Sequence, residues 1–149
     1  MLNFDPITHV YTLDGVRIPS VTQVLEAAGL IDFGGIPDKV LKAAAQRGTD
    51  THSIIEDFSK GIPIPDQWMY PEIQAWEAFC NDFKFESKYQ EYRGADEILK
   101  VGYTIDQIGF FKNTGRTAIV DLKTGVKKIS DIIQVCAYGM LRPADCSRK

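Results

Sequence analysis

The chain has 149 residues, of which 44% are hydrophobic and 25% are charged, and its formal net charge at pH 7 is −3. This length and composition are typical of one globular domain and exclude a disordered tail, a collagen-like fibre and a coiled coil. The net negative charge also argues, at first, against a partner as anionic as nucleic acid.

The first predicted elements are a β-hairpin and a short helix. Strands over 9–13 and 16–18 flank Asp14-Gly15, a dipeptide that tolerates the positive φ of a tight turn. Ser20 is a suitable N-cap for the helix that follows, and Gly29 is a suitable residue to end it.

Helices are predicted next. Pro37 suits a first helical position, and good helix formers follow it over 38–45. Gly48 either breaks this helix or bends it before helical sequence resumes over 51–60. Another helix opens at Pro71 and carries an apolar stripe, which predicts core packing, at Ile73, Trp76, Phe79, Cys80 and Phe83.

Strands dominate the last part of the chain. They are predicted over 86–93, 100–111 and 116–123, and a final helix over 130–141 is stopped by Pro143. The order of elements predicts a single α+β (or mixed α/β) domain over 1–149, with an antiparallel hairpin in its central sheet.

The hairpin between the last two strands brings two carboxylates together. Phe111 and Arg116 bracket a four-residue loop, and this register pairs Asp106 with Asp121, at Cβ distances of about 4.5–5.5 Å. A three-residue loop with a bulge at Gly115 would instead make the aspartates diagonal neighbours. Like charges so close repel, and a bound divalent cation would turn the repulsion into coordination.

Asp121 and Lys123 point to the same face of their strand, because side chains alternate, while Val120 and Leu122 point to the other. Two charges at the end of such an apolar strand are costly unless they are paired or liganded. The alternative is an ordinary salt bridge at the sheet edge, with Asp106 solvated at the end of a turn.

Two helical pairs add polar groups at i,i+4 spacing. His52 and Glu56 share one face of the helix predicted over 51–60, and Gln134 and Tyr138 share one face of the last helix. Either pair alone is also typical of an ordinary helix surface.

Together these residues resemble the PD-(D/E)XK nuclease superfamily, in its RecB-like and phage exonuclease branch. The resembling motifs, in the family's order, are RGTDTHSIIE (47–56), YTID (103–106), IVDLKTG (119–125) and QVCAY (134–138), and the opening phrase YTLDGVRIPSVTQVLEAAGL looks like the leader of phage-type members. The resemblance implies a restriction-endonuclease-like core over about 37–141, with a central mixed sheet flanked by helices. The hairpin and helix over 9–29 would precede this core.

The resemblance also implies a site for Mg²⁺ or Mn²⁺. Asp106, Asp121 and the backbone carbonyl of Leu122 would hold the ion through oxygen ligands, and His52 would add an imidazole ligand. Lys123 would orient the attacking water or stabilise the transition state, and Glu56 would support the ligands or help to hold a second ion.

Further residues would contact DNA or orient the site. Gln134 and Tyr138 match the family's Q-x-x-x-Y element, and Lys127 and Lys128 are candidates for phosphate contacts. Glu91 falls near a position where some relatives carry a glutamate.

Two features depart from the family's pattern. Tyr103 stands where a glycine is usual, three residues before Asp106, with Gly102 one position earlier, which predicts a bulge or a local shift in alignment. The sequence ends soon after the last helix, without the further strand that relatives carry. A minimal sheet of this kind has an edge that invites a homo-oligomer or cover by the N-terminal hairpin.

The resulting hypothesis is a Mg²⁺- or Mn²⁺-dependent deoxyribonuclease, an exonuclease acting on single strands or duplex ends in phage or bacterial DNA recombination or repair. The alternative is a catalytically inactive DNA-binding module of the same fold. Three cysteines without a pairing framework and the lack of a long apolar run predict a cytoplasmic protein, in a bacterial or phage-infected cell, with no membrane partner. Six basic residues against three acidic ones follow position 120, so positive charge gathers beside the predicted site.

Overall fold

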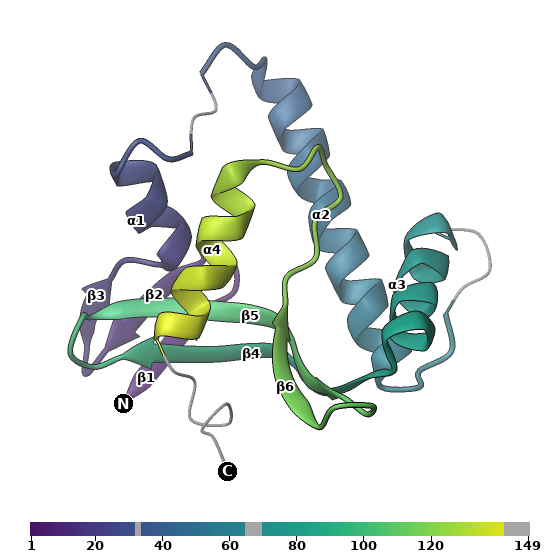
Figure 1. The fold of residues 1–149 in the computed structure, drawn as a ribbon. Coiled ribbons are helices and arrows are strands. Elements are labelled where there is room, and N and C mark those ends of the chain that lie inside the picture. Colours follow the sequence, from purple (N-terminus) through teal and green to yellow (C-terminus); the bar gives the residue numbers. More distant parts are fainter. Residues whose placement is uncertain (32–33, 65–69, 142–149) are drawn as a thin grey trace. The chain divides into compact units, whose positions relative to one another are not determined.

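A computed structural model describes residues 1–31, 34–64 and 70–141. The chain forms two compact units. The first unit comprises Met1–Asp32, Tyr92–Ile105 and Lys128–Lys149, and the second comprises Phe33–Glu91 and Asp106–Lys127. Two long strands, β4 (Phe85–Asp96) and β5 (Val101–Phe111), run through both units (Figure 1).

The chain is α+β, as predicted, with four helices and two three-stranded antiparallel sheets among its described residues. One sheet has the order β1-β2-β3 and the other β4-β5-β6. The predicted central mixed sheet is not found in the described ranges, where parallel pairing is limited to one isolated bridge between Ser20 and Gly102. The N-terminal hairpin builds a sheet of its own because a strand that the sequence did not reveal, β1, pairs with it.

The N-terminal sheet belongs to the first unit. It consists of β1 (Leu2–Asp5), β2 (Val10–Leu13) and β3 (Val16–Ile18), and the β2–β3 turn at Asp14-Gly15 has the predicted positive φ at both residues. Its buried core is formed by Tyr11, Leu13 and Ile18.

Helix α1 (Val21–Ala27) follows this sheet and is capped as expected. The Ser20 side chain accepts from the Gln23 N–H, and Gln23 returns a bond to the Ser20 N–H, so two end groups are satisfied. Gly29, at φ 70°, then ends the helix in the left-handed region. The last helix, α4 (Ile129–Met140), contacts α1 within the same unit.

Packing explains why a glycine stands at position 102. A Cβ at this position would lie 2.4 Å from Cγ of Tyr11, so only glycine leaves room for the Tyr11 ring against β5. Strand β5 continues through this point to Phe111, and Tyr103 is buried.

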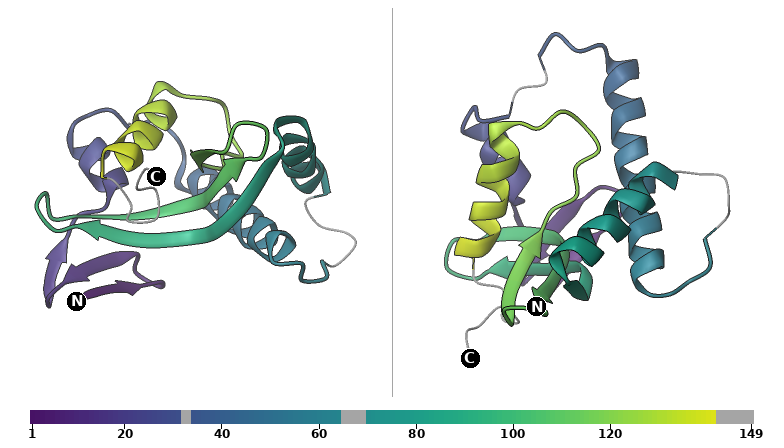
Figure 2. Two further views of the ribbon diagram at one scale, coloured as in Figure 1. Left: turned by 60° about the horizontal axis from the view of Figure 1, so that its bottom comes forward. Right: turned by 45° about the vertical axis from the view of Figure 1, so that its right-hand side comes forward.

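Two helices of the second unit lie side by side (Figure 2). Helix α2 (Asp38–Ser59) is continuous, so Gly48 does not break it, and helix α3 is Tyr70–Phe83. The α3 stripe packs as predicted, except that Phe83 is exposed: Ile73 and Trp76 are buried, and Phe79 and Cys80 pack against the core.

The sheet of the second unit has the predicted register. Strands β5 and β6 (Arg116–Val120) pair from Gln107↔Val120 to Phe111↔Arg116, joined by the predicted four-residue loop. The predicted third strand is shorter than expected, because pairing stops at Val120 and residues 121–123 leave the ladder. Gly109 permits the close approach of β4, since a Cβ there would lie 2.1 Å from the Glu86 carbonyl oxygen.

Two of the cysteines, Cys80 and Cys136, are free thiols, and Cys146 and Pro143 lie outside the described residues. Within the described ranges, no helix is both long and apolar enough to cross a membrane.

Candidate metal centre

Helix α2 presents His52 to the sheet of the second unit. The buried residues of this helix are Thr51, next to His52, and Ile55, one turn further along. Ile55 packs with Trp76 and Phe85 in the core of the unit. This packing fixes the helix face, so that the adjacent His52 side chain lies partly buried over the strands.

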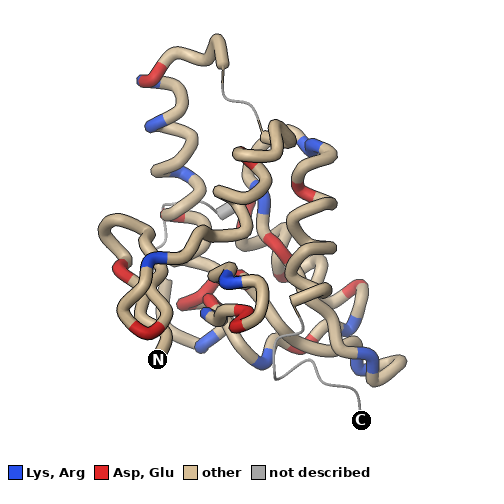
Figure 3. Tube along the Cα trace, turned by 90° about the vertical axis from the view of Figure 1, so that its left-hand side faces the viewer, with Lys and Arg blue, Asp and Glu red and all other residues tan. Residues whose placement is uncertain are grey.

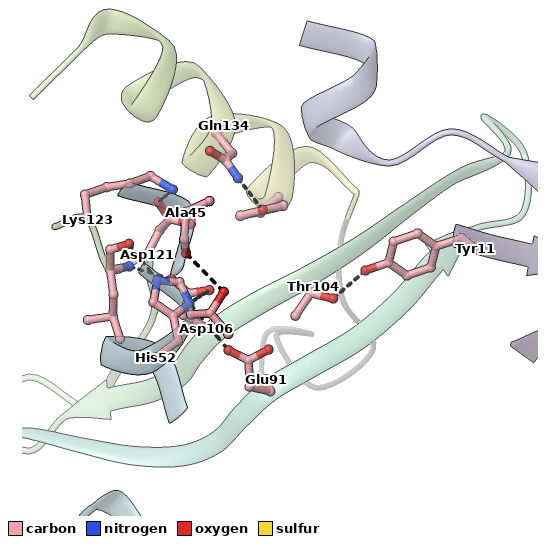
Figure 4. A network of polar contacts seen from close by, with 12 residues as sticks. Tyr11, Ala45, His52, Glu91, Thr104, Asp106, Asp121, Lys123 and Gln134 are labelled. Carbon is pink, nitrogen blue, oxygen red and sulfur yellow. Dashed lines mark hydrogen bonds and ion pairs between the residues drawn. The ribbon is translucent and has the colours of Figure 1, made fainter. Parts of the chain in front are cut away.

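Three ligating side chains meet at this point. His52 Nδ1 lies 3.4 Å from Asp106 Oδ1 and 3.6 Å from Glu91 Oε1, and one ligand atom from each residue lies within 4.8 Å of the other two (Figure 4). Two carboxylate oxygens and an imidazole nitrogen are donor atoms of the kinds that divalent cations bind in proteins. The residues present therefore fit a divalent cation.

Both backbone groups of Leu122 orient these ligands. The Leu122 N–H donates to Asp106 Oδ2 at 2.6 Å, and His52 Nε2 lies 3.1 Å from the Leu122 carbonyl oxygen, the geometry of an N–H donor. The Leu122 N–H and carbonyl groups can make these contacts because the ladder between β5 and β6 ends at Val120. The bonds aim Oδ1 of the aspartate and Nδ1 of the histidine at the centre of the cluster, as hydrogen bonds behind metal ligands commonly do. The Leu122 carbonyl, predicted as a metal ligand, thus contacts His52.

Asp121 and Lys123 lie beside this cluster as an ion pair. Lys123 Nζ is 2.6 Å from Asp121 Oδ2, with the Asp121 side chain only 4% exposed and the Lys123 side chain 37% exposed. The contact matches the predicted common face of the two side chains and the salt bridge of the alternative, but Asp106 is buried rather than solvated as that alternative required. The lysine therefore combines a buried anchor with an accessible ammonium group.

Burial and the neighbouring charges shift the pKa values of Asp106 and His52. Burial raises the pKa of Asp106 to about 6, the charge of Asp121 adds to this rise, and His52 and the Leu122 N–H oppose it. Burial alone would lower the pKa of His52, but Glu91 and Asp106 outweigh it, so the His52 pKa is raised. In the absence of a cation, protons on this cluster therefore offset its negative charge.

Glu91 holds its place with an unusual backbone. Among the described residues it is the one non-glycine residue inside a strand with a positive φ, at 47°. That region costs an ordinary side chain roughly 1–2 kcal/mol, and such conformations concentrate at functional sites. Glu91, to which the sequence did not assign a role in the site, is thus a third candidate ligand beside His52 and Asp106.

Other predicted site residues lie elsewhere. Glu56 pairs with Lys60 at 2.6 Å on the surface of α2, rather than with the ligating cluster. Gln134 and Tyr138, in the first unit, are hydrogen-bonded to each other at 2.6 Å from Nε2 to the hydroxyl oxygen. Lys127 and Lys128 are both exposed.

Basic and acidic residues both occur along the described elements of the chain (Figure 3).

Comparison with known proteins gives no relative: no family model, no curated protein and no solved structure matches the chain.

Proposed function

We propose that this chain is a Mg²⁺- or Mn²⁺-dependent deoxyribonuclease of the PD-(D/E)XK type, acting on DNA ends or single strands. The observation that carries the proposal is the meeting of His52, Glu91 and Asp106 beside the Asp121–Lys123 pair. An imidazole and three carboxylates next to one partly exposed lysine is a charge arrangement suited to phosphate chemistry with a cation. We propose further that the elements from α2 to α4 make a restriction-endonuclease-like core.

The ligating residues would be His52, Glu91 and Asp106, with Asp121 close enough to shift the pKa of Asp106. When bound, the cation supplies Lewis-acid chemistry: it makes water a better nucleophile and offsets the charge that develops on the phosphate. Leu122 keeps two of the ligands in orientation through its backbone groups.

Lys123 is the residue that acts on the phosphate. Its ammonium is anchored by Asp121 and partly exposed, so it can donate to a phosphate oxygen while it keeps the carboxylate as its partner. Such a donor stabilises the negative charge of the transition state more than that of the ground state. Lys123→Met should therefore lower the cleavage rate while Mn²⁺ affinity is kept.

The direct test is digestion of DNA labelled at either end, single- or double-stranded, with Mn²⁺ or Mg²⁺ and with EDTA. We expect metal-dependent cleavage that Asp121→Ala abolishes, while Asp82→Ala, an exposed aspartate at the end of α3, retains it. An intact, Mn²⁺-binding protein that cleaves none of these DNAs would contradict the proposal. DNA binding without cleavage would indicate the inactive module instead.

A further inference from the structure

The second unit contains a cavity of about 360 Å³, lined by α2, α3 and the segment from Val120 to Thr124. This volume lies in the range of small-ligand sites. Three of its lining residues, Asp121, Leu122 and Lys123, also belong to the candidate metal centre or orient it. The cavity is therefore continuous with the site at which the proposed function places a phosphate.

The buried part of the lining is apolar and aromatic. Trp76 and Ile55 are almost fully buried, and the rings of Trp76 and Phe79 stack at a centroid distance of 5.5 Å and an interplanar angle of 17°. Val120 adds an aliphatic wall. A surface of this kind favours a flat, apolar group over a flexible or charged one.

The rest of the lining is polar and rich in acceptors. Thr51, Thr124 and Glu72 supply hydroxyl and carboxylate oxygens, and Arg47 pairs with Glu72 and lowers its pKa, so that this carboxylate stays ionised. Lys123 supplies a cation at the same cavity. Acceptors suit the N–H groups of a heterocycle, and an ammonium suits a phosphate.

We infer that this cavity receives the base of one unpaired nucleotide, the nucleotide whose phosphate lies at Lys123 and the candidate metal centre. The inference rests on the proposed function and names its substrate class. A base cannot enter such a cavity while it is paired and stacked in a duplex. The substrate is therefore single-stranded DNA or a frayed end.

Binding of small probes tests the cavity without cleavage. We expect dAMP to bind at least about tenfold more tightly than 2-deoxyribose 5-phosphate, which has no base, in calorimetric titrations with Mn²⁺. Ala75→Leu places a larger side chain into the cavity from an exposed position of α3 and should remove this preference. Ala78→Leu, also exposed on α3 and absent from the cavity lining, is the matched control and should keep it.

Equal affinities of the wild-type protein for the two probes, or a preference that survives Ala75→Leu, would overturn the inference.

The same variants are then compared on a single-stranded oligonucleotide and its copy with an abasic analogue at the cleaved position. The wild-type protein and Ala78→Leu should cleave the intact strand about tenfold better in kcat/KM, and Ala75→Leu should cleave both alike.

The two hypotheses fail differently. A protein that cleaves both strands equally well keeps the proposed function and loses the base site. A protein that prefers dAMP and cleaves no DNA keeps the base site as a nucleotide-binding cavity and loses the proposed function.

Discussion

Each unit holds a group of buried or partly buried polar side chains. The members of one group are neutral, and the members of the other are mostly charged. In the first unit, Tyr11 and Thr104 share a hydrogen bond between their hydroxyls, and Gln134 donates to the Tyr138 hydroxyl. Neutral partners of this kind satisfy one another and stabilise the fold.

In the second unit, His52, Glu91 and Asp106 meet beside the Asp121–Lys123 ion pair, and protons on Asp106 and His52 offset the excess of negative charge that remains. Buried charge without full compensation costs stability. The neutral group therefore contributes to folding, whereas the charged cluster lowers stability at a place that could hold a cation.

Removing one charge from the cluster should have the largest effect, with opposite signs on activity and stability. Asp106→Asn keeps an acceptor for the Leu122 N–H and removes the carboxylate charge, so cleavage should fall by about 10³-fold or more. Without metal, the free energy of unfolding at pH 8 should rise by up to about 3 kcal/mol, because the Asp106 pKa of about 6 measures an unfavourable ionisation. Urea unfolding in EDTA and cleavage assays in Mn²⁺ measure the two effects; a variant that is less stable than the wild type at this pH would contradict the comparison.

Without metal, the free energy of unfolding should decrease as the pH rises. Asp106 and His52 both have raised pKa values in the fold, so the native state holds their protons more tightly than the unfolded chain does. Their contribution to stability is present at low pH and is lost as the pH rises, for Asp106 between about 4 and 6. Thermal unfolding in EDTA at pH 5 and pH 8 should show this loss, and Mn²⁺ should restore stability at pH 8, where it replaces the protons. A loss that persists unchanged in Asp106→Asn would assign it to other groups.

Glu91 should matter for the cation more than its position on a strand suggests. Glu91→Gln keeps the shape of the side chain and removes one ligating charge, so Mn²⁺ affinity should fall by about tenfold. Glu86→Gln is the matched control on the same strand, since Glu86 pairs with Lys112 at the surface and not with the cluster. Calorimetric titration that gives equal affinities for the two variants would remove Glu91 from the site.

The smallest effect is expected in the neutral group. Tyr11→Phe removes one partner of the Tyr11–Thr104 hydrogen bond and should lower the free energy of unfolding by about 1 kcal/mol. Mn²⁺ affinity should stay as in the wild type, because the side chain takes no part in the ligating cluster. Parallel urea unfolding and calorimetry on this variant check both statements, and a changed affinity would show that the two polar groups are coupled.

Local signals in the sequence predicted much of the fold. The Ser20 cap, the Asp14-Gly15 turn and the register of β5 with β6 follow from short-range rules of backbone chemistry, and all three are confirmed. Strand β1 was missed because its four residues are too few to show alternation, whereas the equally short β2 and β3 were indicated by the Asp14-Gly15 turn between them. Propensity left open whether Gly48 breaks or bends the helix, and α2 runs through this position among the good helix formers that precede it.

Site residues were predictable only where the register of a hairpin or the spacing along a helix brings them together. The register pointed to Asp106, and the i,i+4 pattern singled out His52, but it paired this histidine with Glu56, which instead contacts Lys60. Glu91 enters the cluster from β4 through a left-handed backbone, which no composition or periodicity reveals in a glutamate. The available signals were the resemblance, in which some relatives carry a glutamate near this position, and the place of Glu91 on the strand next to β5, and neither says which way the side chain points.

The end of the β-ladder at Val120 determines how this site can change over evolution. The groups of Leu122 that orient His52 and Asp106 belong to the main chain, so exchange of Leu122 for another apolar residue would keep both hydrogen bonds and the packing of position 122 against the core. The four-residue loop before Arg116 has no such freedom, since adding or deleting one residue there would present the wrong backbone groups to both ligands. Divergent descendants of this chain should therefore vary among apolar residues at 122 while the length of the 112–115 loop stays constant.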